Sequence, residues 1–222
     1  MDRLQSELER LYLVRGAAAG GTAQIVGADG RVRALVLEFA APAAWPDLSR
    51  LWQGVQADLD LPPPAIAVNG RDACQLWFSL AEPVAPEQAD AFLASLRARY
   101  LAGVPAERVR TASPTAPPPA QVGPERWSAF VAPDLAPLFA EEPWLDQPPG
   151  HDAQADLLSR FASVQPEAFA RACASLAAAP RPVPSPAVAP ANAADPRAFL
   201  LSVMQDPTVD LRLRIEAAKA LL

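Results

Sequence analysis

The first apolar pattern of the chain lies at the N-terminus and has helical spacing. Leu4, Leu8 and Leu11 are three or four positions apart and are separated by charged and polar residues. This spacing places them on one face of an amphipathic helix, which we expect to end at Gly16. The segment lacks the apolar run and the cleavage site of a signal peptide, so we expect a cytoplasmic protein.

Two apolar runs then flank a turn. The runs "TAQIVG" at 22–27 and "RVRALVLEFA" at 31–40 are separated by a stretch that contains Asp29 and Gly30. Asp-Gly between two such runs is typical of a β-hairpin. The second run is apolar on both faces except at Glu38, which is typical of a central strand.

The next segment changes from a helical to a strand pattern. An apolar stripe at helical spacing follows Pro46 and stops before three prolines. The stripe consists of Leu48, Leu51, Trp52, Val55 and Leu59. Residues 65–69 and 74–80 then predict two strands around a short turn, and the second strand alternates between two faces.

A second helix and a last strand complete this part of the chain. The helix is predicted to begin at Pro86 and to end at Gly103, and residues 107–111 predict the strand. From residue 33 onward the order is therefore βαββαβ, the split βαβ arrangement of ferredoxin-like folds. We predict an α+β fold for residues 1–112, with a ferredoxin/RRM-like βαββαβ sheet and an N-terminal helix.

The remainder of the chain is rich in proline, which clusters in two stretches. We expect a linker at 113–124, a helical region at 125–178 and a disordered Pro/Ala-rich linker at 179–194. Residues 195–222 predict a helical hairpin that is too small to fold alone. Its apolar faces need a cover, which could be residues 125–178, another copy of the chain or another protein.

Charge and composition exclude several classes of protein. The formal net charge is −6, and no segment has a marked excess of Lys and Arg, so a large phosphate-neutralising surface is not expected. No stretch of about 18 apolar residues exists, which predicts that nothing spans a membrane. Cys74 and Cys173 are far apart and fit neither a disulfide framework nor a metal site, so we expect reduced thiols.

A search for catalytic motifs finds none. Phosphate-cradling glycine loops and the GxSxG elbow are missing. The single histidine, His151, follows two prolines near a predicted helix start, where we expect a structural or surface role. We therefore expect no cofactor, no metal and no enzyme activity.

Three residues each have two alternative interpretations, one functional and one structural. Glu38 lies inside an apolar strand and could be a remnant metal-binding acid or a residue at an exposed strand end. Arg71 and Trp77 could bind a phosphate and stack on a base. Alternatively, Trp77 packs under a helix and Arg71 is a solvated turn residue.

The order of strand "RALVLEF", helix, strands "AIAVNGR" and "QLWFSL" and a further helix resembles archaeo-eukaryotic-type primases. It is especially similar to the primase-polymerases of plasmids, phages and other mobile elements, over residues 22–112. The resemblance implies an acid-x-acid metal pair, of which Glu38 alone remains beside Val36, and a histidine at about the place of Gln75. It implies that two-metal nucleotidyl transfer is lost.

If the likeness holds, a weak contact with single-stranded DNA or nucleotide remains. The residues expected to make this contact are Arg31, Arg33, Arg71, Gln75 and Trp77, with Glu38 as a vestigial acid.

The segment "DPRAFLLSVMQDPTVDLRLRIEAAKALL" at 195–222 is similar to a segment of phage terminase small subunits. That resemblance implies a DNA-recognition subunit that oligomerises and passes DNA to a packaging motor, or a docking hairpin shared by phage-derived proteins. The residues expected to dock a partner or a second copy are Leu211, Arg212, Arg214, Ile215 and Lys219.

Three functional hypotheses follow. The first is a non-catalytic, phage- or mobile-element-derived accessory protein of DNA replication or packaging that binds nucleic acid weakly. The second is a protein–protein interaction module, and the third is a terminase small subunit-like packaging adaptor. A residual enzyme that uses Glu38 together with further acids is the remaining alternative. The position of Glu38, Arg71 and Gln75 discriminates between the first two. An open sheet face carrying all three favours nucleic acid, and a face covered by residues 125–178 favours the interaction module.

Overall fold

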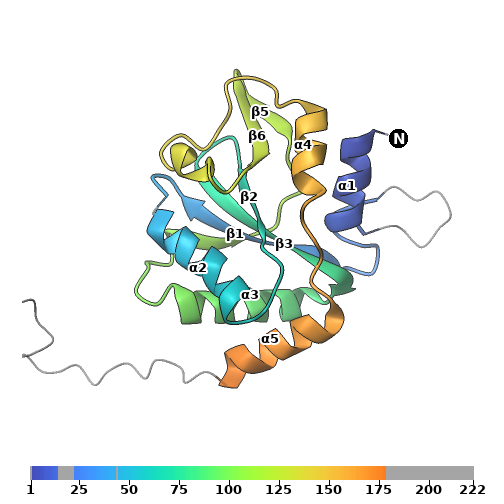
Figure 1. The fold of residues 1–222 in the computed structure, drawn as a ribbon, viewed down its shortest axis with the longest axis vertical. Helices are drawn as coiled ribbons and strands as arrows, with labels where there is room; N and C mark the ends of the chain where they lie inside the picture. The colour runs from blue at the N-terminus through green and yellow to red at the C-terminus, as the bar shows by residue number, and fades with distance from the viewer. Residues whose placement is uncertain (1, 15–22, 44, 179–222) are drawn as a thin grey trace, which may run out of the picture. The chain divides into compact units, whose positions relative to one another are not determined.

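The computed structural model describes residues 2–14, 23–43 and 45–178 of the chain (Figure 1). The predicted linker at 179–194 and the predicted hairpin at 195–222 lie outside the described residues. So do the expected docking residues Leu211, Arg212, Arg214, Ile215 and Lys219.

One six-stranded sheet forms the centre of the described part. Its strands are β1 (Val32–Ala40), β2 (Ala65–Val68), β3 (Ala73–Val84), β4 (Val109–Ala112), β5 (Ala120–Gly123) and β6 (Arg126–Val131). Their order in the sheet is β4-β1-β3-β2-β6-β5, and every neighbouring pair is antiparallel. Together with the helices, this makes the fold α+β, as predicted.

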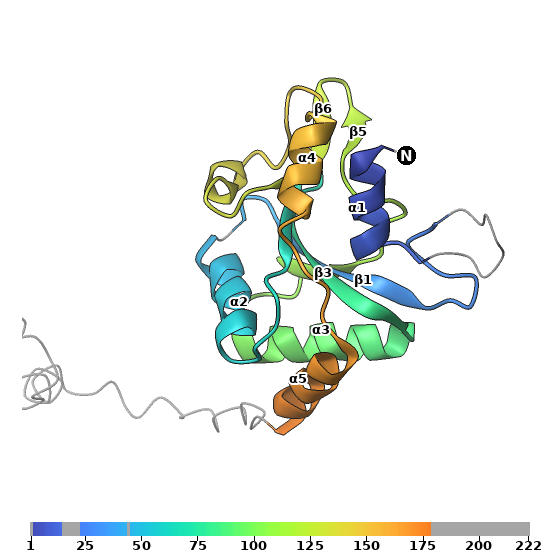
Figure 2. The same cartoon turned by 45° about the vertical axis from the view of Figure 1, so that its right-hand side comes forward.

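Helices cover both faces of the sheet. They are α1 (Arg3–Leu11), α2 (Trp45–Ala57), α3 (Pro86–Tyr100), α4 (His151–Leu158) and α5 (Pro166–Ala178), with a one-turn 3-10 helix, η1 (Ala136–Phe139). Helices α1 and α4 lie side by side on one face, whereas α2 and α3 lie on the other (Figures 1 and 2). Helix α5 packs against α3, where the rings of Phe92 and Phe169 are 4.9 Å apart.

The alternation of β1 divides the core into two layers. Leu35, Leu37 and Phe39 belong to the cluster under α2 and α3, and Ala34 and Val36 belong to the cluster under α1 and α4. Both faces of this strand are buried, which explains why its sequence is apolar in both registers.

Helix starts agree with the sequence pattern. Pro46 and Pro86 lie in the first turns of α2 and α3, where a missing N–H costs nothing. Asp2 caps α1 because its Oδ1 accepts the N–H of Leu4 at 3.3 Å. The helix ends at Leu11 rather than at Gly16, since Val14 already pairs with Gln24.

The predicted turn at Asp29 and Gly30 forms, since the N–H of Gly27 donates to the carbonyl of Arg31 at 2.8 Å, but within the described residues no continuous strand forms before it. Only single bridges form there, from Gln24 to Val14 and from Val26 to Val32. Both backbone groups of Gln24 bond to Val14, at 2.7 and 3.0 Å, so this residue does not pair with β1.

The helical pattern predicted from 125 onward is also wrong at its start, where β6 forms. Phe130 faces the α1 and α4 layer, and Ala129 and Val131 face the α2 and α3 layer. This two-residue period is obscured in so short a segment, because Trp127 and Phe130 also fit a helical spacing. The expected linker at 113–124 supplies β5, which pairs with β6. Among the described residues, no helix is long and apolar enough to cross a bilayer.

Candidate functional site

A row of polar side chains crosses three neighbouring strands, from the edge strand β4 through β1 to β3. Glu38 on β1 lies opposite Gln75 on β3 and opposite Arg110 on β4. Gln75 Nε2 donates to Glu38 Oε1 at 2.6 Å, and Arg110 Nε donates to Glu38 Oε2 at 2.7 Å. Trp77 Nε1 donates to Gln75 Oε1 at 2.8 Å. Four side chains from three strands therefore form one continuous hydrogen-bonded chain.

The network stabilises polar side chains that are buried in the sheet. Glu38 is 9% exposed and Gln75 is 5% exposed, so the carboxylate needs partners to offset its lost hydration. Its hydrogen bond and charge raise the pKa of Arg110 above the ordinary arginine value. The interpretation of Glu38 as an exposed strand-end residue is wrong. Both of its carboxylate oxygens accept hydrogen bonds from the protein.

Trp77 is part of the core rather than a platform for a base. It is 1% exposed. Its ring meets Tyr12 edge-on at 5.2 Å and Phe130 at 5.8 Å, while Tyr12 and Phe130 stack at 5.6 Å. Neither face of the indole is open for stacking. The predicted contact between Trp77 and a base is therefore wrong. The buried Gln75 is closed to nucleic acid for the same reason.

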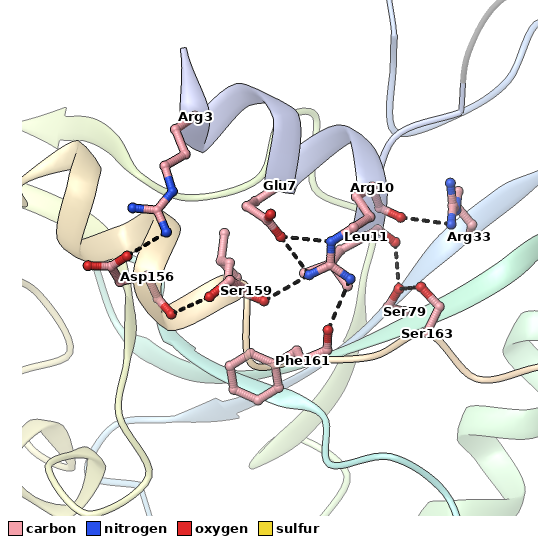
Figure 3. A network of polar contacts seen from close by, with 11 residues as sticks. Arg3, Glu7, Arg10, Leu11, Arg33, Ser79, Asp156, Ser159, Phe161 and Ser163 are labelled. Carbon is pink, nitrogen blue, oxygen red and sulfur yellow. Dashed lines mark hydrogen bonds and ion pairs between the residues drawn. The ribbon is translucent and has the colours of Figure 1, made fainter. Parts of the chain in front are cut away.

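Arg33 fastens the end of α1 and is not a free cation. Its Nη2 donates to the carbonyl of Arg10 at 3.0 Å (Figure 3). Its Nε donates to the carbonyl of Leu80 at 2.9 Å. Burial, and secondarily the charge of Arg10, lower the pKa of Arg33. The expected nucleic-acid contact of Arg33 is therefore replaced by a helix C-terminal cap.

Two of the five expected nucleic-acid residues, Arg31 and Arg71, are exposed. Arg31 precedes β1, whereas Arg71 lies on the β2–β3 turn, beside the other end of β1. A nine-residue strand is roughly 30 Å long, so these two cations do not share one binding surface. The structure thus brings together Glu38 and Gln75 but separates the arginines.

The cover over this sheet face is firmly attached. Arg10 donates to the carbonyls of Leu158 and Phe161, both at 3.0 Å, at the end of α4 (Figure 3). Ser79 Oγ donates to the carbonyl of Leu11 at 2.6 Å. Gln154 on α4 bonds both the N–H and the carbonyl of Phe130 at 2.9 Å. These contacts fix α1 and α4 on the layer that contains Trp77.

Sequence reasoning missed Arg110, Tyr12 and Phe130. The signal for Arg110 was present, because a carboxylate in a central strand requires a partner on a neighbouring strand. No local signal identified the two aromatic residues, which come from segments far from Trp77 in sequence.

The remaining chemistry of the described residues is sparse. No group of three His, Cys, Asp or Glu side chains in the described ranges could hold a metal ion. His151 Nδ1 lies 3.0 Å from Asp2 Oδ2, which agrees with the surface role expected for it. Cys74 and Cys173 are free thiols, and burial raises the pKa of Cys74 to about 11.

Two hollows on the described surface are large enough to hold a small ligand. A groove of about 750 Å³ follows the edge of β1 beside α1, α3 and residues 111–119, and Asp90 is the one charged residue among its described walls. A hollow of about 310 Å³ contains Asp47, Arg50 and Arg108. Arg50 pairs with Asp47 at 2.9 Å, and Arg108 donates to the carbonyl of Pro42. Neither hollow offers the unpaired cations that a phosphate site requires.

No protein-family model matches the chain, and no curated protein matches it.

Proposed function

We propose that this chain is a non-catalytic protein–protein interaction module. The observation that carries the proposal is the burial of Trp77 under Tyr12 and Phe130. In the resembled primases, the corresponding turn and strand form the nucleotide site. Here the chain's own aromatic side chains and α4 occupy that face, so residues 125–178 supply part of the cover.

The fold supports a specific origin for the module. We propose that β1, α2, β2, β3, α3 and β4 form a ferredoxin-like unit, supported by their order and by the strand order β4-β1-β3-β2. This arrangement is compatible with a degenerate primase-like scaffold from a phage or another mobile element, acting inside the cell. The likeness of 195–222 to a terminase small subunit segment supports a place in replication or packaging.

The absence of catalysis is inferred from the state of Glu38. Nucleotidyl transfer of the primase kind needs several acids that hold two metal ions. Glu38 instead binds Gln75 and Arg110 with its two oxygens. The carboxylate links neighbouring strands of the sheet, and a metal ion would have to displace both of its hydrogen-bond partners.

The first experiment is a titration of the full chain with a fluorescent single-stranded DNA at low ionic strength. Phosphate contacts are strongest under these conditions. We expect no saturable binding, and no difference between the wild type and Arg71→Ala. Salt-sensitive, saturable binding that Arg71→Ala weakens would overturn the proposal in favour of the nucleic-acid hypothesis.

The second experiment tests interaction through 195–222 with point variants of the full chain. Leu211→Ser and Ile215→Ser remove apolar residues of the predicted stripe. We expect them to change the sedimentation coefficient or the set of cross-linked partners, relative to Arg197→Ser, which lies in the same segment outside the expected docking residues. Unchanged sedimentation and unchanged partners would count against the hairpin as a docking element.

A further inference from the structure

A loop between β6 and α4 exposes large apolar side chains. Among the described residues, the large apolar residues with exposed side chains are Leu138 at 76%, Leu135 at 50% and Val26 at 46%. Two of these three lie within four positions, on and beside η1. We call residues 132–146 the leucine loop. A single exposed leucine is ordinary on a protein surface, but Leu135 and Leu138 are both exposed and lie three positions apart, so together they offer an apolar contact to another molecule.

The exposure does not come from a loose segment. Ala136 is buried within the loop, and the carbonyl of Ala140 accepts the N–H of Ala43 at 2.6 Å. The carbonyl of Pro143 accepts the N–H of Gly70 at 2.9 Å. The loop is attached to β1, β2 and their neighbours at several points, so it presents Leu135 and Leu138 in a preformed arrangement. Preformed surfaces lose little conformational entropy on binding.

The same loop carries a strong local negative charge. Asp134, Glu141, Glu142 and Asp146 are all exposed, and no ion pair forms at any of them within the described part of the chain. Residues 127–150 contain no Lys or Arg. The nearest cation in sequence, Arg126, lies over the ring of Trp144, 4.1 Å from its centroid.

The combination of exposed leucines and exposed carboxylates on one loop selects the class of partner. Phosphate groups of nucleic acids and anionic lipids would be repelled by four carboxylates. A second copy brings the same net negative charge to the contact. A basic amphipathic helix supplies an apolar stripe for the two leucines and flanking Lys or Arg side chains for the carboxylates.

We propose that the leucine loop docks a basic amphipathic helix of a partner protein. This inference rests on the proposed function and names the surface and the partner chemistry for it. Leu135 and Leu138 pack into the apolar stripe of the helix, and Asp134, Glu141 and Glu142 pair with its cations. The charges act mainly on the association rate and on specificity, while the leucines provide the contact that persists.

The test uses two fluorescent helical peptides with the same leucine stripe, one flanked by Lys and one by Glu. Anisotropy is measured with the full chain. We expect the Lys peptide to bind, and Leu138→Ser to weaken it by about tenfold or more, as for a central contact. The pair Glu141→Lys and Glu142→Lys should weaken binding similarly and reduce its salt dependence.

Matched variants elsewhere on the surface provide the controls. Val26→Ser removes the other exposed apolar residue, and the pair Glu82→Lys and Glu107→Lys makes the same change of net charge at exposed positions. We expect both to bind like the wild type. The substituted side chains are exposed, so the urea unfolding midpoint should confirm that each variant is folded.

The proposal is overturned if the Lys peptide does not bind, if the Glu peptide binds equally, or if the controls weaken binding as much as the loop variants. It is also overturned if the wild type sediments as a dimer that Leu138→Ser dissociates, since the occupant is then a second copy. These outcomes leave the proposed function intact, because that proposal fails on saturable DNA binding instead.

Discussion

The amide of Gln75 donates a hydrogen bond to the carboxylate of Glu38 across neighbouring strands, with 2.6 Å between Nε2 and Oε1. The same amide accepts the indole N–H of Trp77 through its oxygen. Gln75 thus joins the one buried carboxylate of the described core to its largest aromatic ring. A side chain at the expected place of a catalytic histidine has a role in stability.

Gln75→Leu should therefore destabilise the fold. It removes a partner from Glu38 and from Trp77 Nε1, and each buried polar group left without its partner costs about 1–3 kcal/mol. We expect the free energy of unfolding in urea to fall by about 2–6 kcal/mol in total. Gln53→Leu, at an exposed position of α2, is the control and should change it by less than about 0.5 kcal/mol. Equal stability of the two variants would contradict the buried network.

The ion pairs made by Arg110 and by Arg3 should contribute different amounts to the free energy of unfolding. Arg110 pairs with the buried Glu38 at 2.7 Å, whereas Arg3 pairs with Asp156 at 2.7 Å where both side chains are more than half exposed. Arg110→Ala leaves a buried carboxylate with one donor and should cost about 1–3 kcal/mol of unfolding free energy. Arg3→Ala should cost about 0–1 kcal/mol. The opposite ranking in chemical denaturation would show that Glu38 is better hydrated than its burial indicates.

Gly54→Ala should have opposite effects in two backgrounds. A Cβ at Gly54 would lie 2.3 Å from Cε1 of Tyr100, whose hydroxyl is 3.1 Å from both the carbonyl of Gly54 and Oδ2 of Asp58. The clash should cost about 1–3 kcal/mol despite the better helix propensity of alanine. With Tyr100→Ala present, the same change should stabilise by up to about 1 kcal/mol. A double-mutant cycle measured by urea unfolding tests this, and additive effects would refute the clash.

Gly70 and Gly103 separate conformational strain from steric contact. Both have positive φ, +78° and +90°, so alanine is strained at either position. Nothing lies within 4 Å of a Cβ at Gly103, and Gly103→Ala should cost about 1–2 kcal/mol. A Cβ at Gly70 would lie 2.3 Å from Cγ2 of Val122 and 2.8 Å from the Ser128 nitrogen, so β5 and β6 must shift. We expect Gly70→Ala to cost roughly 2 kcal/mol more in thermal or urea unfolding.

Thiol reactivity should depend on folding. Burial raises the pKa of Cys74 to about 11, and it also raises that of Cys173. At pH 8 about one Cys74 thiol in a thousand is then ionised. In the Cys173→Ser variant, where Cys74 is the remaining thiol, we expect reaction with a disulfide reagent only when the protein unfolds. The raised pKa means that the stability from the buried thiol is present below the unfolded pKa and is lost as pH rises through about 11. Rapid labelling of the native variant at pH 8 would contradict this environment.

Local patterns were sufficient where an element is long or begins at a proline. The helices that follow Pro46 and Pro86 form as predicted, as do strands at 65–68, from 73 and from 109. In the two helices and in the strand from 73 the apolar period extends over enough positions to choose between helix and strand, and the prolines at 62–64 mark the start of the strand at 65–68. The pattern does not predict the strand at 126–131, because these six residues fit both a helical and a strand period. They form a strand because they pair with the edge of β2.

The candidate site divides in the same way. The need of Glu38 for a partner follows from a carboxylate in an apolar strand, and Gln75 falls opposite it by strand register. The choice between a nucleotide surface and a core could not be made locally, because the rings that cover Trp77 belong to residues 65 positions before it and 53 positions after it.

The sequence by itself determined the α+β class, most of the elements between 46 and 112, and the presence of one acid inside an apolar strand. Only the tertiary structure decided that this acid forms an ion pair with Arg110, that Tyr12 and Phe130 cover Trp77, and that Leu138 faces solvent. The physical reason is that backbone preference and apolar period are local. The burial of a face depends on which distant segments lie on it.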